Sequence, residues 1–334
     1  MTKKRTIFSG VQPTGNLHLG NYLGAIRNWA VLQNDFECVF CVVDLHAITT
    51  WQPPRVLRNN IREVTAAMIA SGVDADKNVI FSQSRVPAHA ELAWIFNCVA
   101  RLGWLNRMTQ FKDKVGKDKE GASVGLYAYP NLMAADILAY KATHVPVGAD
   151  QKQHLELCRE IAAKFNSDFS VDFFPLVKPI ILDRGMRVMS LKDGTKKMSK
   201  SDPSELSRIM LTDSSDMIAK KIRKAKTDAI EIPAHIEDLK GRLEINNLVE
   251  IYAALANCSP QAVLDIFGGL GHAKFKDDLA DVVIETFNPI KEKLDDLLKN
   301  PDYIDEVLNQ GAERAKTISE PVLKDVHKIL GFLA

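Results

Sequence analysis

The sequence predicts an α/β protein, in which a Rossmann-like parallel sheet is followed by an all-helical C-terminal region. In the first half of the chain, short apolar runs alternate with stretches of helical periodicity. Parallel strands need crossover connections, usually helices, so this alternation predicts a parallel sheet. Strand-like runs fade after about residue 213, while helical periodicity continues. Because single cores rarely grow beyond about 250 to 300 residues, the 334 residues predict two domains, 1–205 and 206–334.

The N-terminal elements follow from these runs in order. They are a strand at 6–9, a helix from His18, a strand at 38–43, a helix ending near Ile69, a strand at 78–81 and a helix at 88–99. The helix from His18 has an apolar stripe of Leu19, Leu23, Ile26 and Ala30. Ligands of parallel sheets sit at the carboxyl ends of strands. We therefore expect a site around residues 10–21, 44–46 and 148–151.

The C-terminal region is expected to contain helices alone. Their expected ranges are 218–225, 242–256, 261–267, 274–298, 303–322 and 321–333. A basic run at residues 220–226, with five cations in seven residues, overlaps the first of these. Such a run fits contacts with nucleic-acid phosphates and a solvated helix face about equally well.

Charge and hydropathy exclude several classes of protein. The net charge of +1 gives no general attraction to nucleic acid, so any such contact must use a local patch. No apolar run approaches the roughly 18 residues that span a bilayer, and the N-terminus has no signal-peptide core. We therefore expect a cytoplasmic protein without a membrane partner.

The five cysteines do not resemble a disulfide framework, because their number is odd and the chain is long. Cys38 and Cys41 lie three apart in an expected strand, so they face opposite sides of the sheet. One zinc ion could not bind both of them without a turn between. We expect buried core thiols and no metal site built by the protein.

A loop near the middle of the chain, Lys197-Met198-Ser199-Lys200-Ser201, follows Gly194 and Thr195. Two ammonium groups and two hydroxyls on a flexible loop can converge on a polyphosphate, whose transfer chemistry depends on positioning and charge neutralisation. Taken alone, the pentapeptide is more typical of a lysine-rich surface turn.

A second motif, residues 12–21, runs from a strand through a loop into a helix. His18 and Asn21 lie three apart in its first turn, where free N–H groups and the helix dipole attract phosphate. Gly20 and Gly24 lower helix propensity and fit the close approach of a flat group such as adenine. The alternative is a capped helix with packing glycines.

These two motifs resemble the signatures of class I aminoacyl-tRNA synthetases. Pro13-Thr14-Gly15-x-x-His18-Leu19-Gly20-Asn21 resembles the first, and the lysine loop matches the second letter for letter. Asn21 replaces the usual second histidine, and an amide can still donate to a phosphate. Further segments, at 8–13, 43–47, 107–112, 129–137 and 146–154, resemble the bacterial tryptophanyl-tRNA synthetases over nearly all of residues 6–202.

The resemblance implies a tryptophan site with Asp136 as acceptor of the indole N–H. Met133 and Asp136 lie three apart on an expected helix, so an apolar surface and a carboxylate can share a pocket. The indole nitrogen only donates and an ionised carboxylate only accepts. Tyr129 and Gln151 resemble the pair that holds the substrate ammonium. The tryptophan-binding residues implied are Phe8, Gly10, Val43, His46, Tyr129, Met133, Asp136, Val147 and Gln151.

The resemblance also implies an ATP site. Its residues are Gln12, Pro13, Thr14, His18, Gly20 and Asn21 for phosphates and adenosine, Gly148, Ala149 and Asp150 for the ribose, Val188 and Met198 for adenine, and Lys197, Ser199, Lys200 and Ser201 in the loop. Ala149 stands where the family usually has an acidic residue. Lys114, Lys197, Ser199 and Lys200 are the catalytic residues implied, acting on the leaving pyrophosphate, and Mg²⁺ shares the charge neutralisation.

The reaction implied is attack of the tryptophan carboxylate on the α-phosphorus of ATP, followed by transfer of the acyl group to a terminal hydroxyl of tRNA(Trp). The resemblance further implies that residues 206–334 read the anticodon and that a homodimer forms through residues 75–130. Two alternatives stay open. One is a tyrosine enzyme or related nucleotidyltransferase, and the other is a non-catalytic RNA-binding paralogue.

Overall fold

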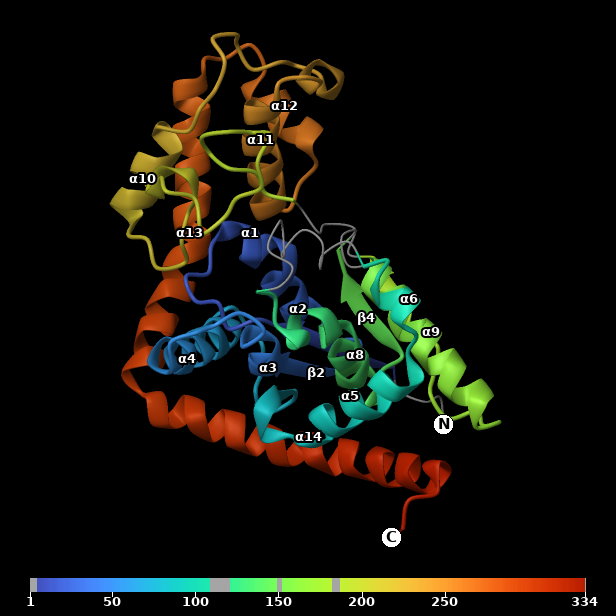
Figure 1. Cartoon of the computed structure of the whole chain (residues 1–334). Coiled ribbons are helices and arrows are strands. Elements are labelled where there is room, and N and C mark those ends of the chain that lie inside the picture. Colours follow the sequence, from blue (N-terminus) through green and yellow to red (C-terminus); the bar gives the residue numbers. More distant parts are fainter. Residues whose placement is uncertain (1–4, 109–120, 149–151, 182–186, 334) are drawn as a thin grey trace.

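The computed structural model describes residues 5–108, 121–148, 152–181 and 187–333. In this part of the chain, five parallel strands form one sheet in the order β3-β2-β1-β4-β5, with helices around it (Figure 1). The strands are β1 (Thr6–Val11), β2 (Glu37–Val42), β3 (Val79–Ser82), β4 (His144–Val147) and β5 (Lys178–Ile181). The predicted α/β class with a parallel sheet is confirmed.

The central strand β1 positions the site. It pairs with β2 in register from Thr6 opposite Glu37 to Val11 opposite Val42, and its other edge pairs with β4 at Ile7 opposite His144. The chain thus builds outward through β2 and β3 and then crosses to β4 on the other side of β1. Crossovers that leave in opposite directions create a crevice at the carboxyl ends of the two strands, here β1 and β4.

The two faces of the sheet contribute to different apolar cores. Cys38 packs in one cluster with Ile7 and Phe40, and Cys41 packs in the other with Phe8. Both thiols are buried and free, and burial raises the pKa of each. Cys38 and Cys41 were predicted to face opposite sides of the sheet and to be core thiols, and this packing agrees with both predictions.

The helices of the N-terminal half cover both faces of the sheet. They are α1 (Leu19–Asn21), α2 (Arg27–Leu32), α3 (Asp44–Ala47), α4 (Pro54–Ala70), α5 (Ala88–Val99), α6 (Leu102–Leu105), α8 (Val124–Leu138) and α9 (Lys152–Asp168), with short turns η1 (Tyr22–Ile26) and η2 (Gln83–Arg85). The helix expected from His18 is divided, because η1 is a π-helical turn between α1 and α2. Leu19, Leu23 and Ile26 are buried, as the stripe predicts.

Beyond residue 205, every regular element of the described residues is helical. These are η4 (Glu205–Ser207), α10 (Ser215–Arg223), η5 (Ile236–Leu239), α11 (Leu243–Ala256), α12 (Pro260–Phe267), α13 (His272–Lys299) and α14 (Pro301–Leu330). The expectation of two helices at 303–322 and 321–333 is wrong, since α14 continues through Pro321. A proline inside a helix costs about 3 kcal/mol. The apolar face that runs from Ile304 to Val326 is buried on both sides of it and offsets that cost.

The last helix packs against the sheet rather than among the other C-terminal helices. Figure 1 shows α13 running the height of the molecule and α14 turning away from it to cross the sheet-bearing part. A Cβ atom on Gly311 would lie 1.7 Å from the Ile80 carbonyl oxygen, so α14 touches the backbone of edge strand β3. Arg314 donates to the carbonyl oxygens of residues 75–78.

The division into domains 1–205 and 206–334 stays a prediction. A single apolar cluster contains Ile7 of β1, Met198 of the lysine loop and Phe275 of α13, so packing is continuous across residue 205. Among the residues that the structure describes, no helix has both the length and the apolar composition needed to cross a membrane.

Candidate functional site

A cavity of about 420 Å³ opens at the carboxyl ends of β1 and β4, where the sheet topology predicts a ligand. Its walls come from β1, β4, α3 and the middle of α8. The lining residues are Phe8, Ser9, Gly10, Gln12, Val43, His46, Tyr129, Met133, Asp136, Ile137, Val145, Pro146 and Val147. All eight described members of the expected tryptophan set are among them. The ninth, Gln151, lies outside the described residues.

The floor of the cavity carries a buried carboxylate, Asp136 on α8, which is 1% exposed. Its Oδ2 lies 2.8 Å from His46 Nε2. Its Oδ1 lies 2.5 Å from the Gln83 amide nitrogen and 2.6 Å from His89 Nδ1. Burial by itself would raise the pKa of Asp136, but the two histidines outweigh it and lower the pKa to about 2. The site therefore presents an ionised acceptor inside an apolar wall.

Two turns before Asp136 on α8, the cavity lining has a paired hydroxyl. Tyr129 Oη lies 2.6 Å from His154 Nε2, and the Tyr129 ring meets the His46 ring edge to face at 6.1 Å. Burial raises the pKa of Tyr129 to about 12, so the phenol stays protonated at neutral pH. Tyr129 and Asp136 thus face one volume with different polar chemistry.

The helix start after β1 is capped by its own side chains. His18 Nδ1 accepts from the Gly20 N–H at 3.1 Å, and the His18 N–H donates to Asn21 Oδ1 at 3.0 Å. A Cβ on Gly20 would lie 3.0 Å from the His18 ring and 3.6 Å from Val188, so the glycine lets both approach. Because Nδ1 is an acceptor, Nε2 carries the proton of the neutral ring and is a donor.

Three cations surround that ring. Burial, then the charges of Lys197, Arg208 and Lys200, lower the pKa of His18 to about 4. His18 and Lys197, which are 179 positions apart in the sequence, therefore belong to one electropositive region. Such a region, beside the protonated Nε2 of His18, can bind the phosphates of a nucleotide.

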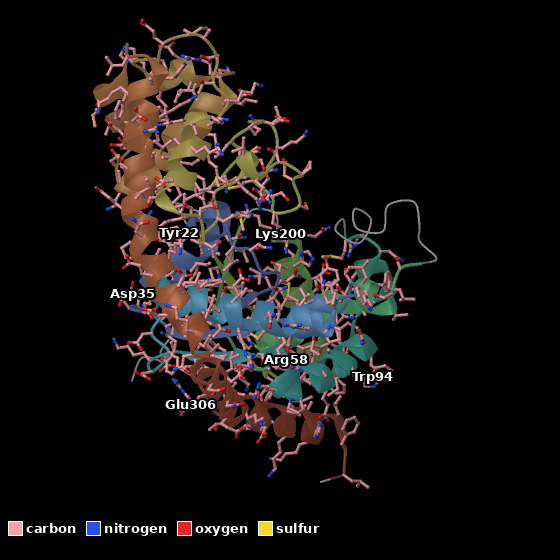
Figure 2. All side chains as sticks on the ribbon, turned by 90° about the vertical axis from the view of Figure 1, so that its left-hand side faces the viewer. Tyr22, Asp35, Arg58, Trp94, Lys200 and Glu306 are labelled. Atoms are coloured by element: carbon pink, nitrogen blue, oxygen red, sulfur yellow. The ribbon has the colours of Figure 1, made fainter. Side chains whose placement is uncertain are left out.

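The lysine loop closes onto the loop after β1. Lys200 Nζ donates to the Thr14 carbonyl oxygen at 2.6 Å. Burial lowers the pKa of Lys200, and the nearby Glu63 opposes this. The Ser199 and Ser201 hydroxyl oxygens lie 2.9 Å apart. Figure 2 places Lys200 between the C-terminal helices and the sheet-bearing part.

The base of the same loop is held by α11. The Met198 N–H donates to the Val188 carbonyl at 3.0 Å, and both side chains are buried. Asn247 on α11 bonds both backbone groups of Met189, the residue after Val188. Its side chain accepts from the Met189 N–H at 2.8 Å and donates to the Met189 carbonyl at 3.0 Å. The Val188 and Met198 backbone groups expected to meet adenine are thus partly used in pairing with each other.

The remaining expected residues divide by position. Gln12 lines the cavity, and Pro13 and Thr14 follow it in the loop that Lys200 contacts. Gly148 is exposed at the end of β4. The other expected positions, Lys114, Ala149 and Asp150, lie outside the described residues.

Four site residues were missed by the sequence reasoning. Gln83 directly follows β3, so the rule that sites lie at strand carboxyl ends could have found it. Arg208, His89 and Asn247 had no comparable signal, because their roles depend on contacts with residues distant in sequence.

Comparison with known proteins adds independent findings. The family model described as tRNA synthetases class I (W and Y) matches residues 1–288. The chain is 55% identical over 351 aligned positions to the tryptophan–tRNA ligase of Brucella melitensis, covering 99% of each chain. It is 57% identical to that of Caulobacter vibrioides, covering 98% of this chain and 95% of the relative.

Solved structures agree. The tryptophanyl-tRNA synthetase of Mycoplasma pneumoniae superimposes with a TM-score of 0.87 at 30% identity, covering 99% of each chain. The Campylobacter jejuni enzyme, complexed with ADP and tryptophan, superimposes with a TM-score of 0.82 at 33% identity, covering 98% of this chain and all of that one.

Proposed function

The chain belongs to the class I tRNA synthetases for tryptophan and tyrosine, and from that membership we propose that it joins L-tryptophan to its tRNA. ATP and tryptophan first form tryptophanyl-adenylate and pyrophosphate. The tryptophanyl group then passes to the 3′ end of tRNA(Trp), for protein synthesis. Curated relatives with this activity match the whole chain at about 55% identity.

The observation that carries the choice of tryptophan is the ionised Asp136 in a cavity that also has an apolar wall. Phe8, Val43, Met133 and Val147 provide the apolar surface for an indole ring. The carboxylate accepts a hydrogen bond from the ring N–H. A site that recognised shape alone could not distinguish indole from a ring of the same shape without this donor. Tyr129 binds the substrate ammonium at the other end of the cavity.

Activation needs no nucleophile from the protein. The cavity fixes tryptophan so that its carboxylate points toward the His18 helix start, and the in-line attack displaces pyrophosphate from the α-phosphorus. His18 Nε2–H donates to a phosphate oxygen. Lys197 and Lys200 neutralise the charge that builds on the leaving pyrophosphate.

We propose that Mg²⁺ enters bound to the ATP phosphates, as is usual for this ion. Within the described residues, no three His, Cys, Asp or Glu side chains cluster in a way that could hold a metal. The ion would contribute charge neutralisation when bound.

The tRNA contacts of the helical region are a separate proposal. Within the basic run, Lys221 pairs with Asp213 at 2.5 Å, Arg223 with Asp277 at 2.8 Å and Lys226 with Glu244 at 2.7 Å. These pairs favour the interpretation as a structural helix face, since only Lys220 and Lys224 of the run remain for phosphate contacts. We propose that residues 206–334 bind the anticodon arm through other side chains.

A homodimer and a cytoplasmic location complete the proposal. Trp94 on α5 is 70% exposed, as is Leu102, and Val124 is 82% exposed. Large apolar side chains on or beside residues 75–130 support a partner surface there. Figure 2 shows Trp94 on the outer side of the sheet-bearing part, away from Lys200. Sedimentation of the protein and of a Trp94→Glu variant tests this, because a dimer through α5 predicts dissociation of the variant.

The deciding experiment is ATP–pyrophosphate exchange with each of the twenty amino acids, followed by charging of purified tRNA(Trp). Exchange that depends on tryptophan, and accumulation of tryptophanyl-tRNA, are expected. Faster exchange with tyrosine would favour the tyrosine alternative, and exchange with no amino acid would favour the non-catalytic paralogue.

A further inference from the structure

Behind the cavity, three buried polar side chains form a hydrogen-bonded group with Asp136. Gln83 and His89 are 0% exposed and Tyr140 is 4% exposed. His89 on α5 lies 2.6 Å from Asp136 Oδ1 through Nδ1 and 2.7 Å from the Tyr140 hydroxyl through Nε2. None of the three lines the cavity. Any effect that they have on a bound substrate is therefore indirect.

The hydrogen bonds of this group have one direction. An ionised carboxylate can only accept, so His89 Nδ1 carries a proton and donates to Asp136. In the tautomer with one proton, on Nδ1, Nε2 is an acceptor and the Tyr140 hydroxyl donates to it. The order Tyr140 to His89 to Asp136 fixes the tautomer of His89 as well as the orientation of its ring.

The same contacts decide which acceptor of Asp136 stays open. A carboxylate offers about four lone-pair directions. Gln83 and His89 use Oδ1, and His46, which lines the cavity, uses Oδ2. The open direction is on Oδ2, the oxygen that the lining residue His46 contacts. Because the terminal torsion of an aspartate is broad, the two contacts to Oδ1 are what prevent the carboxylate from turning that direction away.

Tyr140 connects this group to the cavity wall. Its ring stacks on that of Phe8 with centroids 5.7 Å apart and planes 12° apart, and it packs against Phe81 at 5.9 Å. Phe8 is itself a lining residue. The tyrosine thus fixes both a wall of the cavity and, through His89, its floor.

We propose that His89 and Tyr140 are positioning residues that orient the Asp136 carboxylate toward the indole N–H and so set the preference for tryptophan over ring analogues that lack this donor. The proposal rests on the proposed tryptophan activation. Neither residue touches substrate or ATP, so their loss changes selectivity and leaves ATP binding unaltered.

The test compares tryptophan with β-(benzothiophen-3-yl)alanine, in which sulfur replaces the ring N–H, by ATP–pyrophosphate exchange. The quantity measured is the ratio of kcat/KM for the two substrates. Loss of folded protein lowers both values together and leaves the ratio unchanged, whereas loss of the oriented acceptor lowers the ratio. The KM for ATP is measured in parallel.

Two substitutions of one residue separate its two contacts. An asparagine amide nitrogen stands near the position of His Nδ1, and a glutamine amide nitrogen near that of Nε2. His89→Asn should keep the bond to Asp136 and most of the ratio, while His89→Gln should lose that bond and lower the ratio about tenfold. Tyr140→Phe, which keeps the stacked ring, should lower the ratio about threefold because only the tautomer-fixing donor is lost.

Matched controls are Tyr127→Phe, whose hydroxyl bonds Asn106 at 3.0 Å on the outer side of α8, and His235→Gln at an exposed position. Both should keep the wild-type ratio. Equal ratios in the wild type, His89→Gln and Tyr140→Phe would overturn the proposal. If the wild type activates no tryptophan, the proposed function itself fails, and this outcome is distinct because no ratio can then be formed.

Discussion

His18 is a neutral hydrogen-bond donor at physiological pH, because burial and three neighbouring cations disfavour a fourth positive charge. A phosphate-binding histidine gains nothing from protonation when lysines already provide the charge. Its cap geometry fixes Nε2 as the donor, so the ring can contribute direction where Lys197 and Lys200 contribute charge.

The depressed pKa of His18 makes folding depend on pH. The folded pKa is about 4 and the ordinary value 6.5, so between these values the unfolded chain binds a proton that the folded chain does not. Stability from this residue therefore falls as pH decreases from about 6.5 to about 4, by up to about 1.4 kcal/mol per pH unit. Urea unfolding at several pH values gives the free energy of unfolding as a function of pH. In His18→Asn this dependence should be smaller by about one proton, and an unchanged dependence would contradict the account.

Asp136 should control tryptophan binding more than ATP binding. In Asp136→Ala the indole N–H loses its acceptor and three buried donors lose their partner, so we expect the KM for tryptophan to rise at least about 100-fold. The KM for ATP should change less than about threefold. Asp168→Asn, at the exposed end of α9, is the control in the same exchange assay. Equal effects on both substrates would refute this division of roles.

Lys200 should act on the rate of adenylate formation. Lys200→Ala removes a cation from the phosphate region and its bond to Thr14, so single-turnover adenylate formation should slow about 100-fold or more, with tryptophan affinity changed less than about threefold. Lys196→Ala is the control, because that lysine pairs with Asp193 at 3.1 Å on the loop itself. Similar slowing in both variants would assign the effect to general loop charge.

At the residue scale, the sequence predicted the lining of the cavity and missed what lies behind it. Motif residues such as Asp136 and His46 carry signals of spacing and chemistry. Gln83 and His89 are polar residues in apolar surroundings, and only the tertiary fold reveals that they share one carboxylate.

At the scale of elements, α11 supports a loop that it does not belong to. Asn247 pairs both backbone groups of Met189, and a Cβ on Gly194 would lie 2.8 Å from the Leu243 carbonyl carbon. The start of the lysine loop is therefore seated against the N-terminus of α11. The position of the loop, and so of its lysines, depends on a helix of the C-terminal region.

Asn247→Ala should weaken ATP binding, because it removes a contact that holds the start of the lysine loop against α11. Two backbone groups of Met189 lose their partner, so we expect the KM for ATP to rise about tenfold with a change below about twofold for tryptophan. Asn246→Ala, the neighbouring position on α11, is the matched control in the same kinetics. An unchanged KM for ATP in Asn247→Ala would show that this contact is not needed.

The ranges expected from apolar periodicity agree closely with the structure, with two informative exceptions, but they do not include β4, β5 or α9. The π-helical turn η1 has no sequence signature, and its first residue, Tyr22, packs against Phe287 of α13. Helix α14 passes through Pro321, since burial of its face outweighs the local cost of a proline. Both are cases where packing overrides local preference.

At the scale of the whole molecule, α14 makes the sheet and the C-terminal region one packed body. It covers the edge of β3, and Ala312, Ala315 and Val326 complete the apolar cluster that contains Phe8 and Phe81. The sequence predicted helices here but gave no indication that the last of them returns to the first half. Such long-range packing depends on shape, and in particular on the missing side chain of Gly311.

Gly311→Ala should destabilise the entire fold. The new methyl group would overlap the Ile80 carbonyl, and a backbone atom cannot move aside, so we expect a loss of about 3 kcal/mol in the free energy of unfolding. Gly103→Ala is the matched control, because nothing lies within 4 Å of a Cβ there and alanine favours its helix. Equal stability of the two variants by urea unfolding would contradict this account.

The packing of α14 on β3 also bears on how the protein is made. Strand β3 leaves the ribosome long before residues 301–330 do, so the nascent chain carries an open strand edge for most of its translation. A broken message that ends before codon 301 would yield a product with that edge still exposed, a feature that invites aggregation or proteolysis. Helix α14 therefore covers the edge of β3 only after residues 301–330 have been translated.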